Sequence, residues 1–156
     1  MQKDNIHIYT DGAAKGNPGN AGWGAIILSG KDVFEIGGGV DHATNNQMEL
    51  TAPIEALKYI KSKMSKAGFD IEIVSDSKYV ILGITEWIFK WQKNNWRNAA
   101  KKPVMNRELW EELYELVKEL KPKWTYVKGH NEDKWNERAD EIATSFASGE
   151  PVELSK

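Results

Sequence analysis

The N-terminal part of the chain alternates apolar and polar positions with a period of two, which is typical of β-strands. Ile6 and Ile8, for example, share one face of the first predicted strand. The predicted strands cover residues 5–10, 21–28 and 33–40. Two turn-forming segments separate them, Gly16-Asn17-Pro18-Gly19 and Ser29-Gly30-Lys31-Asp32. Three consecutive strands joined by turns indicate an antiparallel meander.

Helical spacing begins after Thr44, where apolar residues recur every three or four positions. Thr44-Asn45-Asn46-Gln47 has the Thr-x-x-Gln form of a capping box, and the helix that it opens continues to about Gly68. Strand and helix then alternate. The later strands are predicted over 71–75 and 124–127, and the later helices over 78–89, with an interruption at Gly83, 109–120 and 139–146.

This order of elements predicts the α/β class. Three strands, a helix, a strand, helices, a strand and a helix suit a mixed five-stranded sheet with helices on both faces. The chain has 156 residues, of which 40% are hydrophobic, so we expect one domain over residues 1–149. Residues 150–156 are predicted to form a loose C-terminal tail.

Composition excludes several classes of protein. The chain has no cysteine, so disulfides and thiolate metal sites are impossible and a cytoplasmic location is expected. No apolar run approaches the roughly 20 residues that span a bilayer, so no membrane association is expected. The formal net charge is −2, which argues against nucleic-acid binding by bulk charge alone. Any such binding requires a local basic patch.

Four carboxylates stand where predicted strands and helices end. Asp11 and Asp76 each follow a strand, Glu49 lies near the start of the first long helix, and Asp140 lies early in the last helix. Because such ends gather at one edge of an open sheet, we expect the four acids to meet there. Each acid alone also has a structural interpretation, since aspartate forms turns and acids near helix starts favour the helix dipole.

Carboxylates gathered without cysteine or a histidine cluster predict a hard divalent cation. Carboxylate oxygens suit Mg²⁺ or Mn²⁺, and without a cation they would repel one another. Two such ions about 4 Å apart are the usual apparatus for in-line attack on a phosphodiester. The acids therefore predict phosphoryl chemistry.

Five motifs occur in order along the chain. They are Tyr9-Thr10-Asp11-Gly12-Ala13, Gly16-Asn17-Pro18-Gly19, Thr44-Asn45-Asn46-Gln47-Met48-Glu49-Leu50, Ser75-Asp76-Ser77-Lys78-Tyr79-Val80, and Val127-Lys128-Gly129-His130 followed by Asn136-Glu137-Arg138-Ala139-Asp140. With them, the chain resembles the type 1 ribonuclease H family, in its bacterial ribonuclease HI form with a basic protrusion, from about Asn5 to Ala147. The resemblance implies a ribonuclease H-like fold and an endonuclease that hydrolyses the RNA strand of RNA–DNA hybrids.

The same resemblance implies a two-metal mechanism that leaves 5′-phosphate and 3′-hydroxyl ends. Two Mg²⁺ ions per site are implied, with Mn²⁺ as a substitute. The positions that match the family's metal-binding carboxylates are Asp11, Glu49, Asp76 and Asp140. His130 matches a histidine on a mobile loop that helps in catalysis or product release, although a lone histidine usually has a structural explanation.

Discrimination of RNA from DNA depends on the 2′-hydroxyl. The positions that match the family's RNA contacts are Gly12, Asn17, Asn45 and Asn46. Structural alternatives are that Asn17 only shapes its turn and that Asn45 only belongs to the helix cap. Lys78 stands where several relatives carry glutamine, and a lysine is better suited to phosphate or solvent than to a hydroxyl.

A basic, aromatic-rich segment supplies the local patch that the net charge requires. Residues of about 90–103 resemble the family's basic protrusion, which grips the DNA strand. The predicted DNA contacts are Trp87, Trp91, Lys93, Trp96 and Lys101, together with Thr44 and Asn106, which match a DNA-phosphate pocket. As alternatives, the two tryptophans one helical turn apart pack the protrusion against the core, the lysines form a solvated face, and Thr44 and Asn106 cap helices.

Two other functions compete with the hybrid nuclease. A non-enzymatic hybrid-binding module would be expected to lose at least one of the four acids, and this chain retains all four. Integrases and junction resolvases share the fold and acids but cut DNA; the asparagine pair beside Glu49 and the basic protrusion argue against them. We therefore expect a monomer whose partner is the RNA–DNA hybrid duplex.

Overall fold

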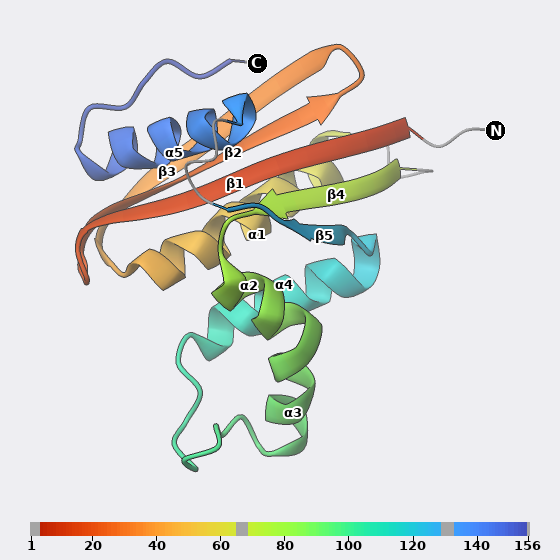
Figure 1. The fold of residues 1–156 in the computed structure, drawn as a ribbon, viewed down its shortest axis with the longest axis vertical. Coiled ribbons are helices and arrows are strands. Elements are labelled where there is room, and N and C mark those ends of the chain that lie inside the picture. The colour runs from red at the N-terminus through yellow and green to blue at the C-terminus, as the bar shows by residue number, and fades with distance from the viewer. Residues whose placement is uncertain (1–3, 65–68, 129–132, 156) are drawn as a thin grey trace.

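The computed structural model describes residues 4–64, 69–128 and 133–155. These residues build a five-stranded sheet in the order β3-β2-β1-β4-β5 (Figure 1). The antiparallel strands are β1 (Asp4–Gly16), β2 (Gly19–Ser29) and β3 (Asp32–Ala43). The parallel strands are β4 (Phe69–Ser75), beside β1, and β5 (Lys123–Tyr126), beside β4. The predicted mixed sheet with its antiparallel part first is confirmed.

The first hairpin is longer than predicted. β1 continues past Thr10 because its pairing with β2 extends to the Gly16–Gly19 pair, which leaves only Asn17 and Pro18 in the turn. Pairing between β1 and β4 stops earlier, at Thr10 and Ser75. Asp11 was expected to end its strand; it lies inside β1 instead, at the level where β4 ends.

The first helix begins with the predicted capping box. α1 (Asn45–Lys63) has Thr44 as its N-cap. The N–H of Gln47 donates to Thr44 Oγ1 at 3.1 Å, and the N–H of Thr44 donates to Gln47 Oε1 at 2.8 Å. This reciprocal pair satisfies two backbone donors at the helix start, so the interpretation of Thr44 as a cap is confirmed.

The next helical segment is continuous but changes its winding. α2 (Lys78–Leu82), the π-helical turn η1 (Gly83–Trp87) and α3 (Ile88–Lys93) follow one another without a break. A Cβ on Gly83 would lie 2.0 Å from the ring of Trp110, so the glycine leaves room for that ring. The predicted irregularity at Gly83 therefore has a packing cause.

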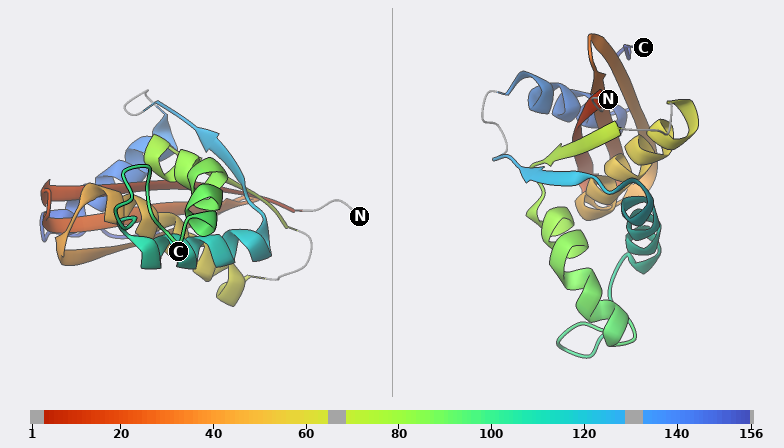
Figure 2. Two further views of the ribbon diagram at one scale, coloured as in Figure 1. Left: turned by 90° about the horizontal axis from the view of Figure 1, so that it is seen from below. Right: turned by 90° about the vertical axis from the view of Figure 1, so that its right-hand side faces the viewer.

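Helices cover both faces of the sheet (Figure 2). α1 and α4 (Arg107–Leu120) pack on one face, where Ile8 and Ile27 point into the larger core cluster. α5 (Lys134–Ala147) packs on the other face, where Ile26 contacts Ile142. The α2–α3 segment and the loop after it project away from the sheet (Figure 1). None of the helices within the described ranges is long and apolar enough to cross a membrane.

The prediction of a loose tail is wrong for residues 150–155. The backbone N–H of Glu35 on β3 donates to Ser155 O at 2.8 Å, and the N–H of Ser155 donates to the Glu35 carboxylate at 2.9 Å. Arg138 on α5 donates to Glu153 O at 2.8 Å. Val152 and Leu154 pack against the core cluster formed by Ile26, Ala139 and Ile142. The tail is held because it satisfies a buried carboxylate and covers apolar surface.

Candidate active site

Two of the predicted acids are brought together by parallel strand pairing. Asp11 lies on β1 just beyond the Thr10–Ser75 pair, and Asp76 directly follows Ser75 at the end of β4. Since paired residues of neighbouring strands lie side by side, the two aspartates share one edge of the sheet.

Glu49 reaches the same place because α1 lies directly against β1. A Cβ on Gly12 would lie 2.6 Å from the Glu49 backbone nitrogen and 2.6 Å from the Met48 carbonyl carbon. Only a glycine lets the two backbones approach so closely. Gly12 therefore positions Glu49 beside Asp11; its predicted contact with RNA stays a prediction.

The three acids form a compact anionic cluster. One carboxylate oxygen from each of Asp11, Glu49 and Asp76 lies within 4.8 Å of the other two. Asp11 is only 7% exposed. Glu49 Oε1 is buried and has no hydrogen-bond partner within the described part of the chain. A buried, unsatisfied carboxylate oxygen between two other carboxylates fits a site for a hard divalent cation.

The electrostatics of the cluster oppose full ionisation. Burial raises the pKa of Asp11 to about 7, and the charges of Asp76 and Asp140 act in the same direction. Hydrogen bonds with Glu49 and with the Gly12 N–H, 2.8 Å away, lower that pKa in part. Burial also raises the pKa of Glu49 well above its ordinary value, and the charge of Asp11 raises it further. A bound cation would reverse these shifts by favouring the charged carboxylates.

The fourth predicted acid approaches the cluster from the opposite face of the sheet. Asp140 lies on α5, is half-buried, and is near enough for its charge to raise the pKa of Asp11. It is not one of the three acids whose oxygens lie within 4.8 Å of one another. His130, the fifth predicted catalytic residue, lies outside the described residues.

The asparagines of the predicted RNA surface cluster at the start of α1. Asn17 Oδ1 accepts a hydrogen bond from the Asn45 N–H at 3.0 Å, so the β1–β2 turn is tied to the first residue of the helix. The side chains of Asn45 and Asn46 are exposed. Asn17 thus does more than shape its own turn. Contacts of these residues with RNA stay predictions.

The tryptophans of the protrusion pack on one another. Trp91 lies 6.1 Å from Trp87, 6.1 Å from Trp96 and 5.3 Å from Trp110, measured between ring centroids. Trp96 is 9% exposed and Trp110 is fully buried. The structural interpretation of Trp87 and Trp91, that they pack the protrusion against the core, is therefore confirmed. Trp87 and Trp91 keep partly exposed rings, whereas little of Trp96 remains to contact DNA.

The predicted cations of the protrusion face solvent. Lys93 and Lys101 are exposed, as a phosphate-binding role requires. Arg107 follows Asn106 at the end of the basic segment and was not among the predicted contacts; its guanidinium lies over the Trp96 ring at 5.1 Å. Lys78 is exposed and lies over the Tyr126 ring at 5.3 Å, so part of its role is to pack on an aromatic ring.

Thr44 and Asn106, the predicted phosphate pocket, differ in their local roles. Thr44 caps α1 with its side chain. Asn106 occupies the N-cap position of α4, but within the described residues its side chain makes no capping bond. Its Nδ2 instead donates to the Tyr79 hydroxyl at 3.2 Å. The capping interpretation of the Asn106 side chain is therefore wrong, because a tertiary acceptor replaces the local one.

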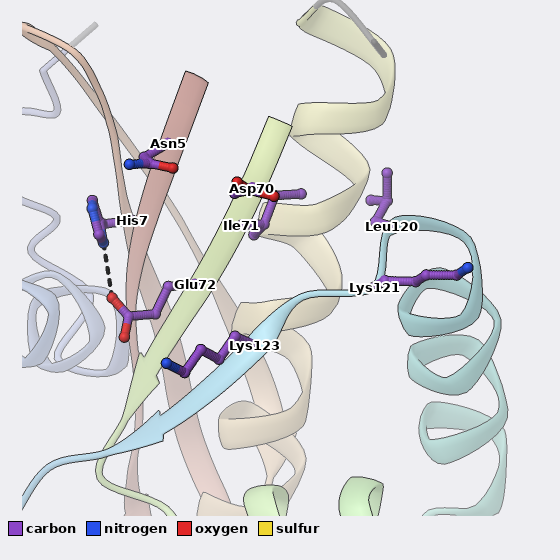
Figure 3. A pocket seen from close by; sticks show the side chains of 8 residues that line it. All are labelled: Asn5, His7, Asp70, Ile71, Glu72, Leu120, Lys121 and Lys123. Carbon is purple, nitrogen blue, oxygen red and sulfur yellow. Dashed lines mark hydrogen bonds and ion pairs between the residues drawn. The ribbon is translucent and has the colours of Figure 1, made fainter. Parts of the chain in front are cut away.

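A separate hollow of about 500 Å³ lies at the opposite end of the sheet (Figure 3). It is formed where β1, β4 and β5 begin, whereas the acid cluster lies past the end of β4. His7 Nδ1 lies 2.8 Å from Glu72 Oε1, and Thr125 donates to Glu72 Oε2 at 2.6 Å. Lys123 adds positive charge beside these groups. The Glu72 carboxylate is thus already hydrogen-bonded through both oxygens, and among the described residues the acids close enough to share a cation are those of the cluster at the other end of the sheet.

The fold and the acid cluster together define a class of protein. A mixed sheet ordered β3-β2-β1-β4-β5, with carboxylates at the end of β4, is the architecture of metal-dependent nucleases with the ribonuclease H-like fold. The family model of RNase H matches residues 3–148. A curated relative named Ribonuclease H, from Thermosynechococcus vestitus, is 48% identical over 148 residues, which cover 94% of this chain and 91% of the relative. The chain belongs to the RNase H family, and its predicted type 1 membership is confirmed.

Solved structures agree with this assignment. LC9-RNase H1, a type 1 RNase H with the type 2 active-site motif, superimposes with a TM-score of 0.83 at 26% identity, over 99% of this chain and 76% of that chain. LC11-RNase H1, solved in complex with an RNA/DNA hybrid, superimposes with a TM-score of 0.72 at 23% identity, over 92% and 97%. The second likeness shows the shared fold.

Proposed function

We propose that this protein is an endonuclease that hydrolyses the RNA strand of RNA–DNA hybrids and leaves 5′-phosphate and 3′-hydroxyl ends. The observation that carries the proposal is the cluster of Asp11, Glu49 and Asp76 in a chain of the RNase H family. Three carboxylates this close suit cation-assisted phosphodiester chemistry better than any acid–base role of their own.

The proposed cofactors are two Mg²⁺ ions, which Mn²⁺ can replace. Asp11, Glu49, Asp76 and Asp140 would hold them, and Glu49 Oε1, which has no hydrogen-bond partner in the ranges that the structure describes, supports at least one ligand position. Bound ions supply Lewis-acid chemistry, activating water and stabilising the leaving oxygen. The side chains of the cluster release a proton when a cation binds, because burial holds the pKa values of Asp11 and Glu49 high without one.

The RNA strand is proposed to lie along the start of α1. Asn17, Asn45 and Asn46 lie near one another there, about one helical turn before Glu49. Amide groups both donate and accept hydrogen bonds, so they can pair with a 2′-hydroxyl, which DNA lacks. This placement puts the groups that recognise RNA next to the acids that cut it.

The DNA strand is proposed to contact the protrusion, through exposed Lys93 and Lys101 and the partly exposed rings of Trp87 and Trp91. LC11-RNase H1 has been solved with an RNA/DNA hybrid, and its shared fold supports the hybrid duplex as the partner. A monomer acting in the cytoplasm, with its catalytic domain over residues 1–149, stays our proposal. His130 is proposed to assist catalysis or product release.

The decisive experiment is cleavage of a strand-labelled RNA–DNA hybrid in Mg²⁺, beside duplex RNA and duplex DNA. RNA-strand cleavage confined to the hybrid is expected, and Asp76→Asn is expected to abolish it while leaving the protein folded. Binding of the hybrid without cleavage in either Mg²⁺ or Mn²⁺ would identify a binding module instead. Cleavage of duplex DNA would identify a DNA nuclease of the same fold.

A further inference from the structure

Tyr79 lies between the acid cluster and the protrusion. It belongs to α2, three residues after Asp76 in the chain. Its ring centroid lies 5.1 Å from that of Trp110 and 6.2 Å from that of Trp87. One side chain therefore spans from the helix that follows the acids to the aromatic cluster that supports the protrusion.

The Tyr79 hydroxyl accepts two hydrogen bonds. Trp110 Nε1 donates to it at 3.3 Å, and Asn106 Nδ2 donates at 3.2 Å. Trp110 is fully buried, and an indole N–H only donates, so this bond holds the hydroxyl oxygen in place. The same oxygen accepts the bond from the Nδ2 side of the Asn106 amide, so this contact holds the amide against the tyrosine.

The conformation of Asn106 has no explanation in helix capping. Its backbone adopts the left-handed region, with φ 63° and ψ 29°, which asparagine tolerates better than most residues. Its side chain turns to Tyr79 rather than to the first turn of α4. The amide is therefore held by a tertiary contact, with its Oδ1 and second Nδ2 hydrogen directed away from the tyrosine.

We propose that Tyr79 is a positioning residue that orients the Asn106 amide toward a phosphate of the DNA strand. This inference rests on the hybrid nuclease proposed above and on the predicted contact of Asn106 with a DNA phosphate. α2 begins two residues after Asp76, so Tyr79 lies on the first turn of the helix that directly follows an acid of the cluster.

The test compares Tyr79→Phe with the wild-type protein in Mg²⁺, using the labelled hybrid. Phenylalanine keeps the ring contacts and removes only the hydroxyl. We expect KM to rise roughly 3- to 10-fold, as for the loss of one oriented hydrogen bond, with kcat within twofold of the wild type. Tyr59→Phe is the matched control, because Tyr59 packs on Phe34 away from the acids, and its KM should not change.

A double-mutant cycle separates positioning from general stability. If Tyr79 acts through Asn106, Tyr79→Phe should raise KM in the wild-type background and have no further effect in Asn106→Ala. If the two effects on KM multiply, or if Tyr79→Phe lowers kcat alone, the proposal is overturned. Tyr79→Phe combined with Lys101→Gln is the contrasting pair. Its two effects on KM should multiply, because Lys101 is predicted to contact a phosphate without the help of Tyr79 or Asn106.

The variant removes the acceptor of a buried indole, so its folding is checked by circular dichroism and its Tm before kinetics. If Tyr79→Phe does not fold, the side-chain amide resonances of Asn106 are followed instead in Asp76→Asn protein as hybrid is added. Binding should shift these resonances, and unshifted resonances on a saturated protein would overturn the proposal. Failure of the wild-type protein to cleave any hybrid would instead contradict the proposed function.

Discussion

At the scale of single residues, the carboxyl group of Asp11 is buried in an environment that disfavours its ionised form. Its pKa is raised from 3.8 to about 7, chiefly by burial. Between these values the folded protein binds more protons than the unfolded chain, so this group's contribution to stability falls as the pH rises. Above pH 7 the ionised Asp11 carboxylate lowers the stability of the folded protein by its full amount unless a cation offsets its charge.

Asp11→Asn is therefore expected to raise the free energy of unfolding of the metal-free protein at pH 8, by about 1–3 kcal/mol, and to abolish cleavage. The neutral amide removes repulsion by Glu49 and Asp76. Urea unfolding in EDTA measures the change. Added Mg²⁺ should stabilise the wild type more than the variant, and a variant that is less stable than the wild type in EDTA would contradict this account.

Glu35 depends on pH with the opposite sign. Its hydrogen bonds with Arg138, at 2.7 and 2.8 Å, lower its pKa below the ordinary 4.5. As the pH falls, the Glu35 carboxylate is therefore protonated in the unfolded chain before it is protonated in the folded protein. The stability that this pair contributes is present above pH 4.5 and is lost as the pH falls through the lowered pKa.

Glu35→Gln is expected to lower the free energy of unfolding at pH 7 by about 1.5–3 kcal/mol, because Arg138 and the Ser155 N–H lose a charged acceptor. Thermal unfolding of the two proteins from pH 7 to pH 3 measures the difference, which should shrink at low pH. Glu141→Gln is the control, since that exposed carboxylate also contacts Arg138 and should cost little. Equal losses in both variants would refute the special role of the buried carboxylate.

At the scale of elements, the sequence predicted those features of helices and strands that depend on residues a few positions apart. The capping box at Thr44 was predictable because its two partners are three residues apart. The irregularity at Gly83 was predictable as a break, but its form was not. The form of the break, the π-helical turn η1, accompanies the close approach of Trp110, which comes from a distant part of the chain.

Gly83→Ala tests how tightly this helical segment is packed. The added Cβ would lie 2.0 Å from the Trp110 ring, which is fully buried and cannot move freely. We expect a loss of roughly 2–4 kcal/mol in the free energy of unfolding. Gly39→Ala on β3, where a Cβ meets nothing nearer than 3.4 Å, should be nearly neutral. Chemical denaturation of both variants decides whether overpacking is the cause.

At the scale of the whole molecule, the net charge of −2 hides an uneven distribution. The acids gather at the end of β4, while Lys93 and Lys101 extend into solvent on the protrusion. Phosphate contacts release counterions, so binding of the hybrid should weaken steeply with salt. We expect the protrusion to supply the local positive charge with which an acidic protein holds a polyanion.

The double variant Lys93→Gln/Lys101→Gln should reduce the slope of log Kd against log salt by about 2, roughly one per lost phosphate contact. Fluorescence anisotropy with a labelled hybrid and Asp76→Asn protein measures binding without cleavage. Lys118→Gln on α4, which lies over Tyr114 beside Glu115, is the matched control and should leave the slope unchanged. A slope that does not change in the double variant would exclude these lysines from the interface.

The sequence by itself determined the kinds of element, their order and the residues able to hold a cation. Hydrophobic period, turns and caps depend on neighbours within a few positions, and carboxylates carry their chemistry wherever they lie. Only the tertiary structure decided that Glu49 Oε1 finds no hydrogen-bond partner among the described residues, that Glu35 holds the C-terminal residues, and that Asn106 turns to Tyr79. Asn106 and Tyr79 are 27 positions apart in the chain, and Glu35 and Ser155 are 120 positions apart. Over such separations, only the packing of the folded chain selects the partner.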